Sequence, residues 1–207
     1  MAASAVAGYI TTPDQIPETP SVFKTGGEVR DALRVTRDDK KKSPKPTIVE
    51  GRVWIIPKDD IDTDMIFHNR YLTITDIRQM GQYTFDNLKG FEDFAKNAKP
   101  GDIVVTQKNF GAGSSRQQAV DCFQSLGISC LLAESYGAIY ERNAINAALP
   151  ILTYKPEIIS LVDLQNGDTL RVDFTTGMLT NLRNNLTAQI DKFYDAQLAI
   201  YRNGGLL

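Results

Sequence analysis

The chain has 207 residues, 42% of them hydrophobic, and a formal net charge of -2. This length and composition suit one domain of ordinary size with a real core plus a tail. The charge provides no basic field for nucleic acid, no apolar run approaches the ~20 residues of a membrane helix, and the N-terminus lacks a signal-peptide pattern. We therefore expect a cytoplasmic protein that binds neither nucleic acid nor membranes.

Residues 1–47 carry several prolines, little apolar periodicity and a charged run at 37–42. A short helix over 26–36 is compatible with the pattern, but nothing else there indicates a packed element. We expect residues 1–47 to form a flexible N-terminal extension. Basic clusters like the one near Lys40 are usually solvated, which disfavours nucleic-acid binding.

The folded part is expected over residues 48–207, where strands and helices alternate. Strands that return after a helix run parallel and are joined by crossover helices. The predicted order is a strand at 52–57, a polar loop at 58–64, a helix at 74–80, a strand at 103–106, a helix at 114–126, a strand at 128–133, a helix at 139–148 and a strand at 151–154.

The last quarter has a different pattern. Asn166-Gly167, flanked by alternating apolar residues, predicts a β-hairpin. Thr187 is predicted to cap a helix that closes at 203–205. The sequence therefore predicts one α/β domain with an antiparallel appendage.

The most informative stretch is Asn109-Phe110-Gly111-Ala112-Gly113-Ser114-Ser115-Arg116, which follows an apolar run. Free N–H groups at a helix start attract an anion, and a guanidinium binds a carboxylate through two parallel hydrogen bonds. Glycines allow positive φ and close approach of the backbone to a ligand. This pattern favours a site for an organic acid. An ordinary serine cap with a solvated arginine is the alternative, and the stretch lacks the glycines of a nucleotide-binding motif.

Four carboxylates lie at Asp59, Asp60, Asp62 and Asp64. They match a calcium loop poorly, since the required glycine and closing glutamate are absent. The acidic turn is therefore either solvated, or it brings Asp64 into a site where it orients or neutralises a cation. His68 is the sole histidine of the sequence and is more often a surface or packing residue than a general base.

Cys122 and Cys130 are the two cysteines of the chain. Buried free thiols are the expected state, because one falls in a helix pattern and the other in an apolar strand pattern. An iron–sulfur cluster normally needs three or four thiolates. We therefore expect no metal ligands in this chain, so any metal comes from a partner.

Three segments together resemble the small subunit of 3-isopropylmalate dehydratase and homoaconitase, in the aconitase superfamily. They are residues 60–64 with Arg70-Tyr71-Leu72, residues 109–116, and Arg142-Asn143-Ala144-Ile145-Asn146 before Leu149-Pro150. The ending Gly204-Gly205-Leu206 is similar as well. The resemblance implies an aconitase-like swivelling domain over residues 48–207.

The resemblance implies a hydro-lyase that dehydrates or isomerises a hydroxy di- or tricarboxylic acid. The expected substrate is an alkylmalate such as 3-isopropylmalate. A [4Fe–4S] cluster would be held by a separate large subunit and act as a Lewis acid. Ser114 matches the family's catalytic base, Ser115 and Arg116 match substrate contacts, and Asp64 matches an acidic residue at the edge of the site. Such a subunit belongs to leucine biosynthesis and is active only in the heteromer.

The sequence also departs from the family pattern. Gln117-Gln118 replaces Glu-His, Ala112 replaces cysteine, His68 replaces proline and Ala138 replaces arginine. Thr73 and Ile74 stand in the loop that helps to select the substrate, and offer an apolar wall with one hydroxyl. The alternative function is a non-catalytic organic-acid-binding or regulatory module on the same fold.

Overall fold

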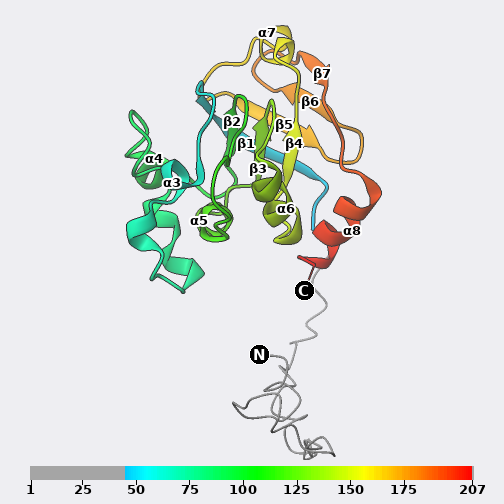
Figure 1. The fold of residues 1–207 in the computed structure, drawn as a ribbon. Coiled ribbons are helices and arrows are strands. Elements are labelled where there is room, and N and C mark those ends of the chain that lie inside the picture. The colour runs from blue at the N-terminus through cyan, green and yellow to red at the C-terminus, as the bar shows by residue number, and fades with distance from the viewer. Residues whose placement is uncertain (1–44, 207) are drawn as a thin grey trace, which may run out of the picture. The chain divides into compact units, whose positions relative to one another are not determined.

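The computed structural model describes residues 45–206 of the chain, and this part is built on a mixed sheet. The strand order is β4-β3-β2-β1-β5-β6-β7 (Figure 1). The strands are β1 (Ile48–Ile56), β2 (Ile103–Thr106), β3 (Cys130–Ala133), β4 (Ile151–Thr153), β5 (Thr169–Asp173), β6 (Met178–Asn181) and β7 (Thr187–Gln189). Strands β1 to β4 are parallel, and β5 to β7 continue antiparallel from β1. This confirms the predicted α/β fold with an antiparallel appendage.

Strand β1 joins the two halves of the sheet. Its first half, Ile48 to Arg52, pairs with β5, and its second half, Val53 to Ile56, pairs with β2. Gly51 lies at the junction, where an added Cβ would be 2.0 Å from the carbonyl oxygen of Gly101. A side chain here would collide with backbone, so the junction requires glycine.

Helices connect the parallel strands. Helix α5 (Gln118–Leu126) runs from β2 to β3, and α6 (Ala138–Asn146) runs from β3 to β4, as crossover helices. The remaining helices are α3 (Thr63–Ile66), α4 (Phe94–Asn97), α7 (Glu157–Leu161) and α8 (Asp195–Asn203), with 3-10 turns η2 (Asn69–Tyr71), η3 (Ile77–Gln79) and η4 (Gly81–Tyr83). None of the helices in residues 45–206 is long and apolar enough to cross a membrane.

Strands β2 and β3 are buried on both faces. In β2, Val104 packs into a first hydrophobic cluster with α5 and α6, whereas Ile103 and Val105 pack into a second cluster with the antiparallel strands, α7 and α8. Successive side chains of a strand point to opposite faces, and burial of both faces explains the uninterrupted apolar run. Cys122 lies in the first cluster and Cys130 in the second, both as buried free thiols, as predicted.

Two predicted helices differ from the observed structure. The helix expected over 114–126 begins only at Gln118, because the backbone from Gly111 to Arg116 forms a turn instead. The segment 74–80 forms no α-helix: two 3-10 turns follow each other, and Asp76 caps the first by accepting from the N–H of Arg78. Aspartate competes with helical hydrogen bonding in this way.

Two predictions in the last quarter are wrong in detail. The turn at Asn166-Gly167 precedes β5, whose first partner is β1, and the observed hairpin joins β5 to β6. Thr187 begins β7 and caps no helix; α8 starts at Asp195 and ends with Gly204 in the left-handed conformation, as expected for its C-terminus. Long-range strand pairing overrides the local signals here. The predicted extension and the possible helix at 26–36 lie almost wholly outside the described residues.

Candidate functional site

The segment Gly111 to Arg116, here called the serine turn, is bound to residues 58–64, here called the acidic loop, which lead into α3. Gly111 donates its N–H to the carbonyl of Ile61 (2.7 Å), and Thr63 donates its N–H to the carbonyl of Ala112 (2.9 Å). The Thr63 hydroxyl also donates to the carbonyl of Ser114 (3.1 Å). Two segments some 50 residues apart in the sequence are therefore held side by side.

Glycine is required at the start of the serine turn. Gly111 has φ +77°, and a Cβ there would lie 2.2 Å from Cγ of the Tyr140 ring. Gly113 has φ +94°, but the nearest atoms to an added Cβ are 3.8 Å away. Gly111 is therefore required both for its positive φ and for lack of space, whereas Gly113 is required only for its positive φ.

The two serines face solvent rather than capping α5. Ser114 and Ser115 are exposed, and the residue at the N-cap is Gln117, which makes no side-chain cap hydrogen bond. Within residues 45–206 the Ser114 hydroxyl has no partner, while Ser115 Oγ accepts a long hydrogen bond from Asn143 Nδ2 (3.5 Å). The explanation of these serines as ordinary helix caps is therefore wrong.

The serine turn and Gln117 after it contain backbone N–H groups that have no acceptor within residues 45–206. From Gly113 to Gln117, the N–H groups find no acceptor in the part of the chain that is described. N–H groups without an acceptor, followed by the start of α5, carry partial positive charges that suit an anion. These N–H groups belong to the turn before α5, whereas the sequence predicts them in the first turn of a helix; the anion site stays a prediction.

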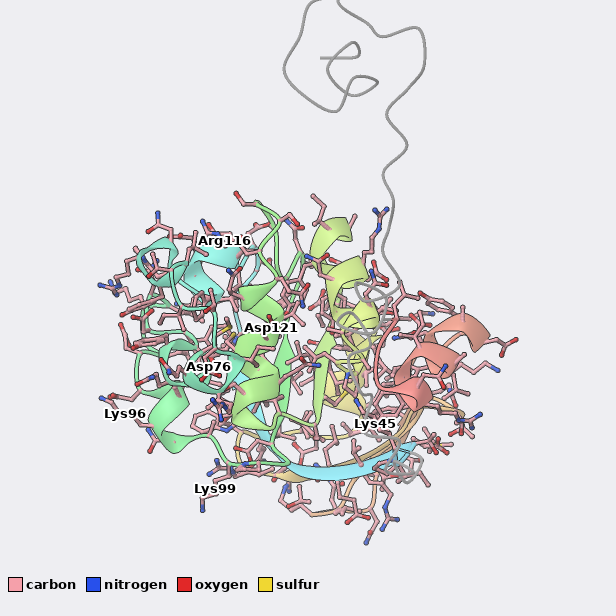
Figure 2. All side chains as sticks on the ribbon, turned by 90° about the horizontal axis from the view of Figure 1, so that it is seen from below. Lys45, Asp76, Lys96, Lys99, Arg116 and Asp121 are labelled. Carbon is pink, nitrogen blue, oxygen red and sulfur yellow. The ribbon has the colours of Figure 1, made fainter. Side chains whose placement is uncertain are left out.

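Arg116, labelled in Figure 2, is paired with Asp64, and the pair links the serine turn to α3. Nη1 of Arg116 donates to Asp64 Oδ1 (2.6 Å) and to the carbonyl of Phe67 (3.1 Å). Nε and Nη2 have no partner among the described residues. One edge of the guanidinium is anchored, and the other is free to receive a carboxylate.

Asp64 is held from several sides. Its Oδ1 accepts from the N–H of Asn69 (3.0 Å) as well as from Arg116, and Asn87 Nδ2 lies 3.4 Å from Oδ2. Burial raises the pKa of Asp64, but the hydrogen bonds from Arg116 and Asn69 outweigh it and hold the pKa below its usual value. Asp64 is therefore an anion that fixes the arginine. The sequence offered no signal for Asn87.

Three further predicted residues, His68, Thr73 and Ile74, lie in the segment after α3. His68 caps η2 and approaches Asp64, with 3.9 Å between Nε2 and Oδ2. Thr73 is exposed, whereas Ile74 is half-buried against the first hydrophobic cluster. Within the described residues no hydrogen bond joins Thr73 or Ile74 to the serine turn. His68 and Asn69 are the residues of this loop that reach Asp64, and the roles of Thr73 and Ile74 stay predictions.

The remaining acidic side chains bind backbone and amide donors. Asp59 accepts from the N–H of Lys108 (2.9 Å), Asp60 accepts from Asn109 Nδ2 (2.8 Å), and Asp62 caps α3. In residues 45–206 no three His, Cys, Asp or Glu side chains are grouped as a metal site. These carboxylates organise the loop.

The cysteines do not fit an iron–sulfur cluster. Cys122 and Cys130 lie in different clusters on opposite faces of the sheet, both fully buried. Burial raises the pKa of Cys122 to about 12 and that of Cys130 still further, so both are held as thiols. The described residues therefore cannot ligate a cluster.

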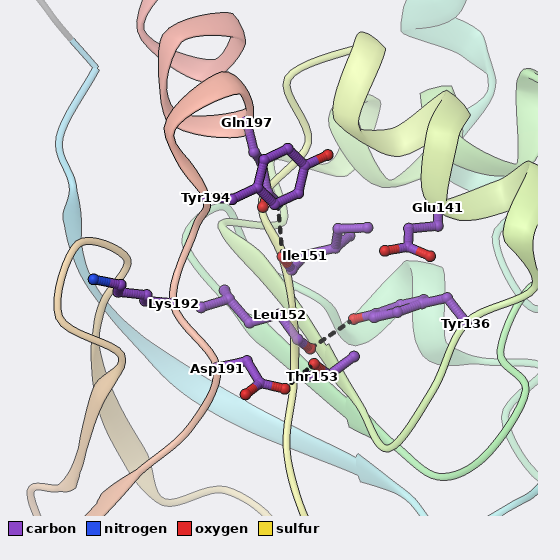
Figure 3. A pocket seen from close by; sticks show the side chains of 9 residues that line it. All are labelled: Tyr136, Glu141, Ile151, Leu152, Thr153, Asp191, Lys192, Tyr194 and Gln197. Carbon is purple, nitrogen blue, oxygen red and sulfur yellow. Dashed lines mark hydrogen bonds between the residues drawn. The ribbon is translucent and has the colours of Figure 1, made fainter.

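A pocket of about 150 Å³ lies at the edge of β4, away from the serine turn (Figure 3). One wall is Tyr136, whose hydroxyl donates to the carbonyls of Leu131 and Leu152. Neither Ser114 nor Arg116 lines it. In the serine turn, Ser114 and Ser115 are exposed to solvent.

The mixed sheet thus carries a glycine-containing turn with two exposed serines and an arginine anchored by Asp64. The sequence of residues 53–157 matches the aconitase C-terminal domain, and the chain belongs to this family. This confirms the resemblance seen in the sequence.

Relatives agree with this membership. The chain is 40% identical over 159 residues to the 3-isopropylmalate dehydratase small subunit of Clostridium beijerinckii, covering 77% of this chain and 95% of that protein. It is 36% identical over 160 residues to the methanogen homoaconitase small subunit of Methanothermobacter thermautotrophicus, covering 77% and 89%. The crystal structure of 3-isopropylmalate dehydratase from Methanocaldococcus jannaschii superposes with a TM-score of 0.70 at 31% identity, covering 77% and 90%.

Proposed function

We propose that this chain is the small subunit of a two-chain hydro-lyase that dehydrates or isomerises a hydroxy di- or tricarboxylic acid. The proposed substrate is an alkylmalate such as 3-isopropylmalate. The observation that carries the proposal is Arg116, anchored at one edge by Asp64 and open at the other, beside the exposed Ser114. The small subunits that this chain resembles act in isopropylmalate dehydratase and homoaconitase.

Ser114 is proposed as the base that removes the proton α to a carboxylate. A serine hydroxyl is a weak base, so its anionic form has to be stabilised by the site. The free N–H groups from Gly113 to Gln117 and the open edge of Arg116 are the donors available for this. Ser115 and Arg116 are proposed to bind the substrate carboxylate, and Asp64 to keep Arg116 aimed at it.

The large subunit is proposed to hold the [4Fe–4S] cluster, because the described cysteines of this chain cannot. When bound, the cluster would supply a Lewis acid for the substrate hydroxyl. The same partner would cover the serine turn and exclude water from it. Because the large subunit is proposed to supply both the cluster and this cover, the small chain is expected to be inactive alone.

The test is reconstitution. The isolated chain is expected to be colourless and inactive, whereas anaerobic co-purification with its large subunit is expected to give an iron-containing complex that converts 3-isopropylmalate. A brown, iron-containing preparation of this chain alone would contradict the assignment of the cluster. A loaded complex with no activity on any alkylmalate or homoaconitate would contradict the enzymatic function.

The second candidate is a non-catalytic module that binds organic acids. It is motivated by Gln117, Gln118 and Ala138, where the resemblance predicts charged residues or histidine. Calorimetry with the reconstituted complex separates the two. Binding of isopropylmalate without turnover would favour the module, and turnover would exclude it.

A further inference from the structure

Asp121 is a buried carboxylate in the first turn of α5, labelled in Figure 2, that the proposed reaction does not use. The residue is 9% exposed, and its Oδ1 accepts a hydrogen bond from Gln117 Nε2 at 2.8 Å. Among the described residues no other donor reaches this carboxylate. Burial raises the pKa of Asp121 above its usual value, although the hydrogen bond from Gln117 lowers it. The buried carboxylate therefore depends on Gln117 for its hydrogen bond.

Gln117 is joined to Asp121 through its backbone as well. The carbonyl of Gln117 accepts the N–H of Val120 at 2.8 Å and that of Asp121 at 3.0 Å. Because Gln117 is exposed, packing constrains its side chain little, and the bond to Asp121 fixes it. Gln117 follows Arg116 directly and ends the run of free N–H groups that begins at Gly113. The residue that connects the serine turn to α5 is therefore fastened at both its backbone and its side chain.

The same bond accounts for one departure from the family pattern. Gln117 stands where the resemblance predicts glutamate. A glutamate would direct a second carboxylate at Asp121, and two carboxylates in contact repel each other and raise the pKa of the pair. A glutamine amide instead supplies the donor that the buried carboxylate needs. The presence of glutamine at position 117 is therefore explained by Asp121.

We propose that Asp121 is a positioning residue for the serine turn, and that it acts through the side-chain amide of Gln117. With this bond in place, the end of the turn is fixed and its free N–H groups keep one orientation. Without it, Gln117 is released where the turn meets α5, and the donors on either side of Arg116 lose that orientation. The inference rests on the proposed function, because it assigns these donors to the substrate and to Ser114.

NMR on the full-length small subunit tests the contact without activity. The signals to follow are the carboxyl carbon of Asp121 and the backbone N–H groups of Ser115 and Arg116. Gln117→Glu is expected to raise the pKa of Asp121 further and to shift both N–H signals. In the double variant Gln117→Glu/Asp121→Asn, the new amide can donate to the new carboxylate. The N–H signals of the double variant are therefore expected to return toward their wild-type positions.

Gln118→Glu is the matched control, because it makes the same change one residue further along the chain. Among the described residues the Gln118 side chain has no hydrogen bond, and this variant is expected to move the Ser115 and Arg116 signals far less. Signals that stay at their wild-type positions in Gln117→Glu would overturn the proposal. Signals that move equally in Gln118→Glu, or that do not return in the double variant, would overturn it too.

The consequence for the reaction is measured in the reconstituted complex with isopropylmalate. Gln117→Glu is expected to lower kcat/KM about tenfold, and the double variant is expected to recover most of this loss, as coupled residues do. An unchanged kcat/KM in Gln117→Glu, or a loss that the double variant does not recover, contradicts the positioning role. A wild-type complex without activity would count against the proposed function, and the NMR result would then decide the role of Asp121.

Discussion

Asp64 and Arg116 are 52 positions apart, yet the carboxylate of one lies 2.6 Å from the guanidinium of the other. The carboxylate occupies one edge of the guanidinium and leaves the opposite edge open. An arginine fixed in this way loses little conformational freedom when it binds a second carboxylate. The pair therefore supports the proposed role of Arg116 in binding an acidic substrate.

Asp64→Asn is expected to raise KM in the complex by about 10–100-fold, because a charge-assisted hydrogen bond contributes about 1.5–3 kcal/mol. Steady-state kinetics with isopropylmalate check this. Asp62→Asn is the matched control, since asparagine caps a helix as well as aspartate; Asp62 caps α3 in the same loop. Equal effects of the two variants would mean that Asp64 acts only through folding.

Ser114→Ala is expected to lower kcat by at least about 100-fold while substrate affinity is largely retained, because a general base acts in the transition state. Ser115→Ala, which removes the neighbouring hydroxyl, is expected to raise KM instead. Comparing kcat and the substrate Kd of both variants checks the assignment. Near-normal turnover by Ser114→Ala would place the base elsewhere.

Thr73→Arg is expected to shift preference from alkylmalates toward homoaconitate, because an arginine in this exposed loop can pair with a distal carboxylate. An alkyl group on an apolar wall contributes roughly 1–3 kcal/mol, whereas burying an unpaired carboxylate is costly. The ratio of kcat/KM for isopropylmalate, a smaller alkylmalate and homoaconitate measures the preference. A wild-type preference for homoaconitate would contradict the prediction.

Gly111→Ala is expected to lower the free energy of unfolding by about 2–4 kcal/mol, because it combines positive φ with overpacking. The new Cβ would lie 2.2 Å from the Tyr140 ring. Gly113→Ala is the control, with positive φ but no atom closer than 3.8 Å, and is expected to cost about 1–2 kcal/mol. Urea unfolding measures both, and equal losses would show that the contact with Tyr140 is unimportant.

The carboxylate of Asp102, which lies away from the serine turn, is expected to stabilise the fold at pH values above its folded-state pKa. Asp102 is 3% exposed. Burial raises its pKa, but hydrogen bonds from Arg52, the Lys99 N–H and Trp54 outweigh this and hold the pKa below its usual value. Asp102→Asn should lower the free energy of unfolding by about 2–4 kcal/mol at pH 7.

The pH dependence of this effect follows from linkage. Because the folded-state pKa of Asp102 is depressed, its contribution is complete above the unfolded pKa of about 3.9 and disappears as pH falls through the folded pKa. Unfolding experiments at pH 7 and in acid should therefore show the gap between wild type and Asp102→Asn closing. A gap that stays constant in acid would mean that charge on Asp102 does not matter.

The sequence by itself determined the elements whose cause is local. The apolar run of β2, bounded by Gly101-Asp102 and a polar loop, predicted Ile103 to Thr106 with its observed bounds. The alternation of strands and helices predicted parallel pairing with crossover helices, because few topologies are compatible with that order. Gly111 and Gly113 were marked as positions of positive φ, which the backbone shows.

The tertiary structure alone decided what depends on distant partners. It placed Thr187 in β7 by pairing it with Thr180, against its local signal for a helix cap. It also moved the start of α5 to Gln118, because the serine turn is bound to the acidic loop, and it joined Asp64 to Arg116. Local propensities are worth less than about 1 kcal/mol per residue, so pairing and burial across the fold outweigh them wherever the two conflict.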